Sequence, residues 1–328
     1  MRKTFIHRLT GEPDDNRQPF LRESGSYSIL IGSVIVLLFV LAAVFGQYAP
    51  RLGLFPHSPT EVRYDRFDAP PSIPMLRTVL DRREEFDFAL TEPIPGHIFG
   101  TDNDGRDIFI RVMNGASTYL YAGILTVLIS LLLGSVLGSV SGYYRGTWSE
   151  SVSTYITNVL DAYPRIVILI IVAFISNFNL YPIMITLGIL NATRVARIVS
   201  NITESLKHSD FILAAKEMGL PDLTIIVKHI VWFNCRHLLS IQMIYGFASV
   251  ILIEATLSYI GYGIGDPMVS WGRMIYEGAG GRYPFNFVDG IYWQAFPPAV
   301  AIIGTVLGLN LLGDGLSRRF GVGQINYI

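Results

Sequence analysis

The sequence predicts an all-α integral membrane protein with six transmembrane helices. Hydrophobic residues make up 51% of its 328 residues and charged residues only 16%, well below the ~25% charged residues of a typical soluble domain. Two stretches, residues 24–50 and 112–144, contain no Asp, Glu, Lys or Arg. Each is longer than the ~20 apolar residues that a helix needs to cross the hydrocarbon layer. We therefore expect the chain to cross a membrane several times.

Six apolar windows are long enough to span the bilayer. They are residues 27–45, 118–140, 152–175, 180–199, 238–259 and 292–312. The third and fourth windows are divided at residues 176–179, a polar cluster followed closely by Pro182, because a five-span count would require this turn to be helical. Pro164 lies inside the third window and is a candidate kink.

The distribution of Lys and Arg predicts that both termini lie in the cytoplasm. One set of segments holds most of the basic residues: Arg2, Lys3, Arg8, Arg17, Arg22, Arg145, Arg194, Arg197, Lys207, Lys216, Lys228, Arg236, Arg318 and Arg319. On the opposite side, the turn at residues 176–179 carries none, and residues 261–290 carry only Arg273 and Arg282. Because cytoplasmic segments are enriched in Lys and Arg, the first set is assigned to the cytoplasm.

These assignments divide the chain into consecutive segments. Residues 1–26 are a cytoplasmic N-terminal segment, residues 27–45 a retained transmembrane anchor, residues 46–117 an extracytoplasmic loop, residues 118–320 a core of five transmembrane helices with a cytoplasmic loop at 200–236, and residues 321–328 a cytoplasmic tail. Many prolines and scattered charges predict an irregular extracytoplasmic loop, with a short helix near residues 75–88.

Charge and motif content exclude several classes of function. Basic and acidic residues number 25 and 26, so the chain lacks the basic excess with which nucleic-acid-binding proteins neutralise phosphates. Cys235 is the single cysteine, which excludes an intrachain disulfide and a cysteine-based metal site. None of the histidines has another four positions away, as a helical zinc site requires. No Gly-Lys pair, Gly-x-Ser-x-Gly or His-Glu-x-x-His occurs, so neither nucleotide binding nor catalysis is predicted.

The cytoplasmic loop is predicted to contain a short amphipathic helix at residues 211–219. Gly219 and Pro221 are expected to end this helix. Small side chains at Ala214 and Ala215 would let another protein surface approach the backbone closely. The candidate contact residues are Phe211, Leu213, Ala214, Ala215, Met218, Gly219 and Leu220. The alternative is an interfacial helix that rests on lipid headgroups.

Ionisable residues in or near the predicted spans are candidate functional groups, because hydrocarbon penalises their charge. Asp161 lies one helical turn before Arg165, so pairing of these two side chains is the simplest account. Glu254 lies nearer the outer end of the fifth span, where headgroups or water would solvate it or where it would face a pathway.

Glycines at fixed spacing predict close contacts between helices. Gly134, Gly138 and Gly142 recur every fourth residue in the second span, and Gly304 and Gly308 form a similar face in the sixth. Residues without a side chain at this spacing let two membrane helices approach each other closely.

The segment Gly100-Thr101-Asp102-Asn103-Asp104-Gly105-Arg106-Asp107 precedes the second span. Its carboxylates do not follow the spacing of a calcium-binding EF-hand loop, in which the glycine comes later. We instead expect a tight turn at Gly105, with Asp102 and Arg106 or Asp107 satisfying backbone groups at the start of a helix.

This segment and several others resemble those of one family, the C-type permease subunit of the dipeptide, oligopeptide and nickel ATP-binding-cassette (ABC) importers. The cytoplasmic Leu213-Ala214-Ala215, Gly219 and the later Ile225-Ile226-Val227-Lys228-His229-Ile230 are similar to its Glu-Ala-Ala loop, although Leu213 replaces the usual Glu and Trp232 replaces a common Pro. The residues that match the family signatures are Gly100, Thr101, Asp102, Gly105, Arg106, Asp107, Glu254, Ser270, Trp271, Gly272, Gly313 and Asp314.

The resemblance implies a type I ABC importer permease fold with a coupling helix between the fourth and fifth spans. The partners that it implies are a homologous B-type permease, two cytoplasmic ATPase subunits and an extracytoplasmic solute-binding protein that lands on residues 266–282. The resemblance also implies the lipid bilayer of a bacterial cytoplasmic (inner) membrane as the surroundings of the chain. The chain itself is expected to hold no cofactor and to catalyse no reaction, since ATP and Mg²⁺ would bind in the ATPase subunits.

Two alternatives to a peptide importer remain open from the sequence. One is an importer of nickel or another peptide-like solute in the same family. The other, from a different class, is an ion-driven secondary carrier, for which Asp161 and Pro164 form the candidate site near the midplane.

Overall fold

The computed structural model describes residues 18–48, 60, 62, 67–81, 93–265, 268–280 and 291–320, and the structural statements below concern these residues. They are largely helical, as predicted, and their β pairing consists of two isolated bridges, Asp81 with Ile291 and Thr101 with Asp107. The predicted C-terminal tail, most of the predicted N-terminal segment and the second half of the helix predicted near residues 75–88 lie outside the described residues.

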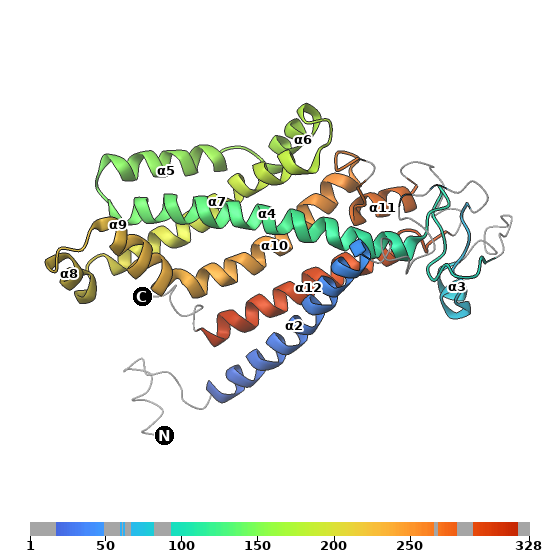
Figure 1. Ribbon diagram of the computed structural model, residues 1–328, viewed down its shortest axis with the longest axis horizontal. Coiled ribbons are helices and arrows are strands. Elements are labelled where there is room, and N and C mark those ends of the chain that lie inside the picture. Colours follow the sequence, from blue (N-terminus) through green and yellow to red (C-terminus); the bar gives the residue numbers. More distant parts are fainter. Residues whose placement is uncertain are drawn as a thin grey trace, which may run out of the picture.

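Long apolar helices run along the length of the molecule (Figure 1). They are α2 (Gln18–Tyr48), α4 (Ile108–Tyr143), α7 (Leu180–Leu206), α10 (Arg236–Tyr259) and α12 (Phe296–Arg319). α10 continues directly from α9 (Asp222–Thr224) and η2, a π-helix at Ile225–Cys235. Each of these helices is long and apolar enough to cross a membrane, and each corresponds to one predicted span. α4 begins at Ile108 rather than at 118, and α12 at Phe296 rather than at 292.

The glycines of α4 form its contact with α7, as predicted. A Cβ atom added to Gly134 would lie 2.5 Å from Cβ of Val195, and one added to Gly138 would lie 2.4 Å from the carbonyl oxygen of Ala196. Gly142 is equally close to the next turn of α7. Because no side chain separates the two backbones, α4 and α7 pack as one unit.

A second close pair consists of α2 and α12. A Cβ atom on Gly308 would lie 2.5 Å from Ile35, and one on Gly32 would lie 2.5 Å from the backbone nitrogen of Leu312. Gly304, by contrast, has no neighbouring atom within 4 Å. The prediction of close packing is confirmed for Gly308 and wrong for Gly304.

The third predicted span is not one helix. α5 (Trp148–Asp161) and α6 (Arg165–Ile175) are bent by 78° relative to each other. Pro164 lies at the break, where it precedes the first residue of α6, so the predicted kink is a complete interruption. The polar turn predicted at residues 176–179 is confirmed. It includes Asn177 and Phe178, both with positive φ, and it separates α6 from α7.

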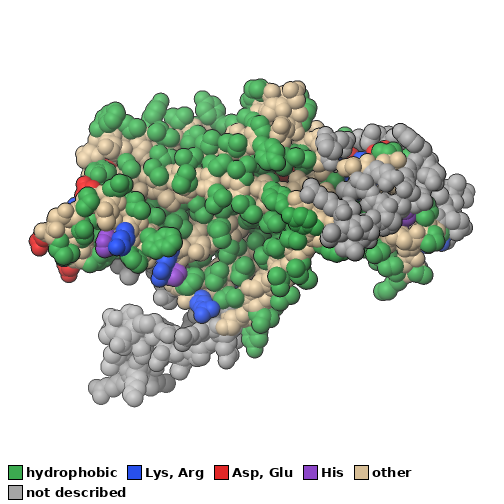
Figure 2. Space-filling model, in the orientation of Figure 1, with side chains coloured by type: hydrophobic (Ala, Val, Ile, Leu, Met, Phe, Trp, Pro, Cys, Tyr) green, Lys and Arg blue, Asp and Glu red, His purple; other side chains and the backbone are tan. Residues whose placement is uncertain are grey.

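The two ends of the bundle differ in structure and charge. α8 (Asp210–Glu217) and α9 lie at one end, toward which the start of α2 and the end of α12 also point, whereas α3 (Pro74–Leu80) and α11 (Trp271–Gly278) lie at the other (Figure 1). Hydrophobic side chains cover most of the visible face between them (Figure 2). Of the described basic residues that the charge distribution assigns to the cytoplasm, the α8 end carries Arg145, Lys207, Lys216, Arg318 and Arg319. We call the opposite end the outer end.

Candidate functional site

The amphipathic helix predicted at residues 211–219 is α8, and its C-terminal stop is well defined. Gly219 has φ of +76°, a conformation that favours glycine. The Leu220 N–H donates to the carbonyl of Ala215 (3.2 Å) and the Gly219 N–H to that of Lys216 (2.9 Å). This pair of hydrogen bonds is the Schellman motif, and it confirms that Gly219 ends the helix.

α8 has an inner and an outer face. Ile212 is fully buried and Ala215 is 3% exposed, and both pack in a cluster that includes Val199, Ile225 and Cys235. The outer face presents Phe211, Leu213, Ala214, Met218 and Gly219, all exposed. The expectation that Ala215 admits another protein surface is therefore wrong, because it lies one turn after Ile212 on the inner face. Leu220 is half-buried against the same cluster.

Polar contacts tie this cluster to the end of α4. The Tyr143 hydroxyl donates to Oδ1 of Asp222 (2.6 Å), and the Tyr144 hydroxyl donates to Oδ2 of Asp222 (3.3 Å). Nζ of Lys216 lies 4.8 Å from the centroid of the Tyr143 ring, within range of a cation–π contact. Burial and the Asp222 carboxylate raise the pKa of Tyr144, so its hydroxyl remains a donor at neutral pH. α8 is thus supported by the transmembrane helices rather than by its loop alone.

Beside α8 lies a polar hollow of about 660 Å³. Its lining residues are Arg145, Asn201, Glu204, Ser205, Lys207 and His208. Arg145 pairs with Glu204 within it. Arg145 and Lys207 follow the C-terminal ends of α4 and α7, where positive charge compensates the exposed carbonyl groups of a helix. Among the described residues, no group of three or more His, Cys, Asp or Glu side chains is arranged to hold a metal ion.

At the outer end, the segment that resembles the first signature forms a tight loop ahead of α4. Gly105 has φ of +71°. Oδ1 of Asp102 accepts a hydrogen bond from the backbone N–H of Arg106 (2.9 Å). Asp107 is the N-cap of α4, and its Oδ1 accepts from a backbone N–H in the first turn (2.9 Å). The turn and the capped helix start expected from the sequence are confirmed.

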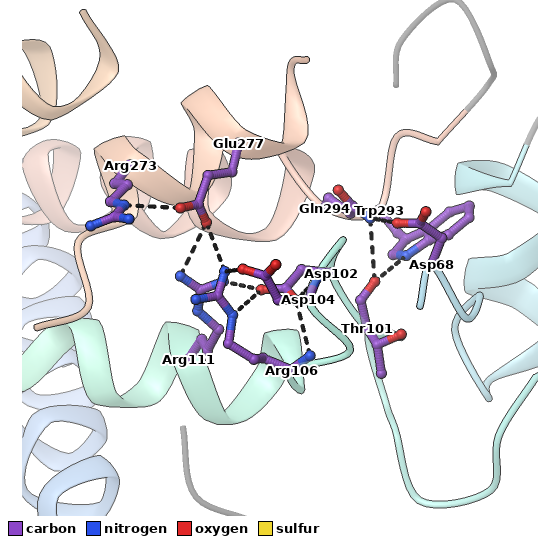
Figure 3. A network of polar contacts seen from close by, with 10 residues as sticks. All are labelled: Asp68, Thr101, Asp102, Asp104, Arg106, Arg111, Arg273, Glu277, Trp293 and Gln294. Atoms are coloured by element: carbon purple, nitrogen blue, oxygen red, sulfur yellow. Dashed lines mark hydrogen bonds and ion pairs between the residues drawn. The ribbon is translucent and has the colours of Figure 1, made fainter. Parts of the chain in front are cut away.

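Charged side chains from this loop, α4 and α11 form a buried network (Figure 3). Nε of Arg106 donates to Oδ2 of Asp102 (2.8 Å), and its Nη2 to Oε2 of Glu277 (3.1 Å). Arg111 pairs with Asp102 and donates from Nη2 to Glu277 (3.2 Å). Burial alone would raise the pKa of Asp102, but the neighbouring Arg111 and Arg106 outweigh this effect and lower it. Nη2 of Arg106 also pairs with Oδ2 of Asp104 (2.8 Å). Three acids therefore face these two guanidinium groups, the arrangement that makes buried charge tolerable.

Several members of this network were not among the predicted site residues. They are Arg111, Glu277 and Arg273, whose Nε donates to Oε1 of Glu277 (2.9 Å). Two sequence signals point to them: Arg111 directly precedes the long uncharged stretch, and Arg273 and Glu277 have the i, i+4 spacing of a helical ion pair. Neither signal indicates that the two segments meet.

Gly100 and Thr101 fix the loop to the segment that precedes α12. A Cβ atom on Gly100 would lie 2.4 Å from the carbonyl oxygen of Ala69. Nε1 of the fully buried Trp293 donates to the carbonyl of Thr101 (3.0 Å), and Oγ1 of Thr101 accepts from the Ala69 N–H (2.9 Å). The signature therefore acts as a structural joint between distant parts of the chain.

Glu254 joins α10 to α11. Its Oε1 accepts from the Ser258 hydroxyl (2.5 Å) and its Oε2 from the Ser270 hydroxyl (3.0 Å). The expectation that headgroups or water solvate Glu254 is wrong, because the residue is only 2% exposed. α11 folds back against the end of α10 and covers the carboxyl group, which hydroxyl donors solvate in place of water.

Trp271 and Gly272 also lie at the outer end. Together with the loop at residues 100–107, the ion network and Glu254, they form what we call the outer cluster. Nε1 of Trp271 donates to the carbonyl of Val112 in α4 (2.8 Å). A Cβ atom on Gly272 would lie 2.3 Å from the carbonyl oxygen of Ala255 in α10, so only glycine fits. Three segments that resemble family signatures and lie far apart in the sequence thus meet at the outer end.

The last signature pair lies elsewhere, between α10 and α12. The Tyr245 hydroxyl donates to Oδ1 of Asp314. A Cβ atom on Gly313 would lie 2.9 Å from the ring of Tyr245. These contacts join the two helices, and the structure does not bring Gly313 or Asp314 together with the outer cluster.

The predicted pairing of Asp161 with Arg165 is confirmed and is part of a larger cluster at the α5–α6 break. Nη2 of Arg165 donates to Oδ1 of Asp161 (3.3 Å). Two residues of α7, Thr193 and Arg197, also contact the Asp161 carboxylate. Sequence reasoning did not identify these α7 partners, since nothing in their local pattern relates them to α5.

The membrane-spanning helices, with the supported α8 at one end and the packed outer cluster at the other, define a multi-pass membrane protein. Residues 130–321 match the family described as "Binding-protein-dependent transport system inner membrane component", and the chain belongs to this family. This is the family of type I ABC importer permeases, and the relatives place the chain among importers of the peptide type.

Its relatives carry names of peptide transport. The chain is 30% identical to the dipeptide transport system permease protein DppC of Alkalihalophilus pseudofirmus over 92% of its length and 87% of that protein. It is 30% identical to the oligopeptide transport system permease protein OppC of Bacillus subtilis, with the same coverage. With the glutathione transport system permease protein GsiD of Escherichia coli it shares 31% identity over 93% of this chain and 91% of the relative.

Proposed function

We propose that this chain is the C-type permease subunit of an ATP-driven, binding-protein-dependent importer of di- or oligopeptides in a bacterial cytoplasmic membrane. It would form half of the translocation pathway, with a homologous B-type permease as the other half. Two cytoplasmic ATPase subunits would bind ATP and Mg²⁺, and α8 would sit in a cleft on one of them. Nucleotide-driven closure of the ATPases would then move the membrane helices between outward and inward access.

The two-faced structure of α8 carries this proposal. Phe211, Leu213 and Met218 are 46%, 44% and 73% exposed, an apolar outer face that water solvates poorly. The inner face is held rigidly by Ile212 and by the contacts to Tyr143. A helix that transmits force needs both features: a surface that another protein can cover, and a support that moves with the bundle.

The alternative is that the exposed face of α8 rests on lipid headgroups. α4 has 36 residues, which corresponds to about 54 Å at 1.5 Å per residue, and the bilayer is about 40–45 Å thick with its headgroups. α8 packs against Tyr143, the last residue of α4, so the length of α4 is compatible with both. The two alternatives differ in what α8 contacts, and recruitment of the ATPase by α8 variants distinguishes them.

At the outer end, α11 and the loop ahead of α4 would form part of the landing site for the solute-binding protein. Of the loop expected to take this role, residues 268–280 are described, and they include α11. The buried ion network makes this surface rigid, so a bound partner would meet a preformed shape. The nickel alternative stays open, since the binding protein rather than the permease would select the solute.

A matched pair of variants tests the role of α8. Met218, the C-cap residue of α8, is 73% exposed, and Met75 in α3, at the opposite end, is 79% exposed. Met218→Asp should abolish ATP-dependent uptake and lower the amount of ATPase that co-purifies in mild detergent, with membrane insertion unchanged. Met75→Asp should leave ATPase recruitment at the level of the unmodified protein. Normal uptake by the Met218→Asp protein would refute the contact.

The energy source and the solute need separate measurements. Uptake into cells should stop when ATP is depleted and continue when an ionophore collapses the ion gradients, and the opposite result would favour the ion-driven carrier. Mass spectrometry of small molecules retained by the co-purified binding protein should identify a peptide. Retention of a nickel complex would instead support a nickel importer of the same family.

A further inference from the structure

Exposed basic and aromatic side chains gather at the α8 end of the bundle, where η2, the start of α10 and the end of α12 meet. What we call the basic–aromatic patch consists of Lys228, Trp232, Phe233, Arg236, Arg319 and Phe320, all of them exposed. Trp232 is the most exposed of its rings, at 66%. The corresponding corner of the molecule in Figure 2 shows Lys, Arg and His side chains beside hydrophobic ones.

Ring contacts hold the patch together. The ring centroids of His237 and Phe320 lie 4.2 Å apart, with 34° between the ring planes, so the start of α10 is joined to the residue that follows α12. The hydrogen bond between Tyr245 and Asp314 joins the same two helices nearby. The patch is therefore one surface made by separate elements, and its basic residues are held close to its aromatic rings.

The patch carries positive charge that the described acids do not balance. Lys228, Arg236 and Arg319 form no ion pair with an acid in the part of the chain that the structure describes. Asp314 lies four residues before Arg318 on α12 and acts on the same Tyr245 hydroxyl, so Arg318 is the neighbour that balances its charge. Three cations beside exposed aromatic rings remain.

The length of α12 places this patch at the depth of the lipid headgroups. Residues 296–313 carry no charge and extend over about 27 Å at 1.5 Å per residue, close to the ~30 Å of the hydrocarbon core. Arg319 lies about 9 Å further along the helix axis, and hydrocarbon would penalise its charge. The patch therefore lies beside the headgroups of the leaflet at the α8 end, which the charge distribution assigns to the cytoplasm.

An anionic phospholipid matches both parts of the patch. Its phosphate accepts charge-assisted hydrogen bonds from Lys and Arg, and basic clusters at the cytoplasmic ends of membrane helices attract anionic lipids. Tryptophan is enriched at the membrane–water interface, where its ring meets the boundary between headgroups and acyl chains. Water alone would solvate the cations but not the large rings that lie among them.

We propose that the basic–aromatic patch binds the headgroup of an anionic phospholipid of the cytoplasmic leaflet. Lys228, Arg236 and Arg319 donate to the headgroup phosphate, and Trp232 lies against the lipid below it. The inference does not rest on the proposed function, because it needs neither an ATPase nor a solute. A zwitterionic phospholipid carries its own cation and so binds the same surface more weakly.

Trp232 itself reports on the lipid beside it. The complete complex is placed in nanodiscs of phosphatidylcholine with increasing mole fractions of phosphatidylglycerol or phosphatidylcholine that is brominated near the carbonyl end of its acyl chains. Bromine quenches tryptophan on contact, and subtracting the signal of the Trp232→Phe protein isolates Trp232. Brominated phosphatidylglycerol should reach half-maximal quenching at a mole fraction at least about tenfold lower than brominated phosphatidylcholine, since each basic residue near an anionic lipid is worth about fivefold.

Charge variants test which residues recognise the headgroup. Arg236→Gln should reduce the preference for phosphatidylglycerol about fivefold, and Arg236→Gln combined with Lys228→Gln and Arg319→Gln should abolish it. Arg194→Gln makes the same change at an exposed arginine of α7 outside the patch, and it should leave the preference unchanged. Raising the salt from about 0.1 M to about 1 M should also weaken the preference, because the Debye length falls from about 10 Å to about 3 Å.

Each remaining outcome would overturn the proposal. Equal quenching by the two brominated lipids would mean that the patch meets the bilayer without recognising charge. No quenching by either would mean that protein, such as an ATPase subunit, covers the patch instead of lipid. A preference that survives the triple variant would assign the recognition to other residues. If Trp232→Phe does not assemble, Trp232→Tyr replaces it. The assay needs neither ATP nor uptake, so its failure leaves the importer function standing.

Discussion

The two faces of α8 predict opposite effects for truncations at adjacent positions. Ile212 is fully buried, whereas Leu213 is 44% exposed. Ile212→Ala leaves a cavity in the cluster beneath α8 and should cost about 2–5 kcal/mol. Leu213→Ala removes side-chain atoms from the surface and should change stability by no more than about 0.5 kcal/mol. The two variants therefore separate support of the helix from contact with a partner.

Cys235 provides a direct probe of this difference. It is the single cysteine of the chain and is fully buried in the same cluster as Ile212. Its thiol reacts with an alkylating reagent only when the cluster opens, so the rate follows the free energy of local opening. At 1.4 kcal/mol per factor of ten, Ile212→Ala should accelerate labelling by about thirtyfold to several-thousandfold. Mass spectrometry of the peptide that contains Cys235 measures this rate in the intact complex.

Leu213→Ala should label at the rate of the unmodified protein and should instead weaken ATPase recruitment. Equal acceleration of Cys235 labelling in both variants, or no acceleration in Ile212→Ala, would show that the inner and outer faces of α8 are assigned incorrectly. Because both variants carry the same new residue one position apart on one helix, differences in helix propensity between them are small.

Other substitutions test the outer network and the α4–α7 contact. Glu277→Gln leaves two buried guanidinium groups short of one acid and should cost about 3–5 kcal/mol, so an unchanged thermal unfolding midpoint in detergent would contradict the network. Because the folded pKa of Asp102 is lowered, its contribution to stability is complete above its unfolded pKa of about 4 and is lost as pH falls further; the midpoint should drop less steeply below pH 4 in Asp102→Asn than in the unmodified protein. Gly138→Leu should disrupt the bundle, seen as loss of the monodisperse peak in size-exclusion chromatography, whereas Gly304→Leu, placed where no atom lies within 4 Å, should not.

The membrane spans could be predicted because hydrocarbon imposes both a length and a composition on each helix. The turn at residues 176–179 could also be predicted, since a polar cluster with a following proline interrupts the apolar pattern. Pro164 indicated a break in the third span but not its 78° angle, because a proline removes a backbone donor without specifying where the next helix packs.

The outer cluster could not be assembled from the sequence alone. Each segment showed a local signal, such as the glycine of a turn or an i, i+4 ion pair, but Arg111 and Glu277 meet only because α11 folds back against α4. The burial of Glu254 has the same origin. For α8, helical periodicity places Ile212 and Ala215 on one face, but only the packing shows that this face is the inner one.

The α5–α6 break bears on the choice between a carrier and an importer. An ion-driven carrier was expected to place an ionisable residue and an unwound segment near the midplane, whereas Asp161 and Pro164 lie at the α5–α6 break, beside the C-terminal half of α7. The feature by itself therefore does not distinguish the two classes. Membership of the binding-protein-dependent family favours the importer.

α4 connects the two ends at which partners are proposed to act. Its N-terminus is fixed in the outer network through Asp107 and Arg111, and its C-terminus holds the support of α8 through Tyr143 and Asp222. Between these points, the glycine contacts join it to α7 without intervening side chains. A helix fixed at both ends and along its middle cannot absorb a displacement by bending, because packed helices move as rigid bodies. Displacement of α8 by an ATPase is therefore expected to move α4 and α7 together and, because Arg197 of α7 pairs with Asp161, to act on the end of α5.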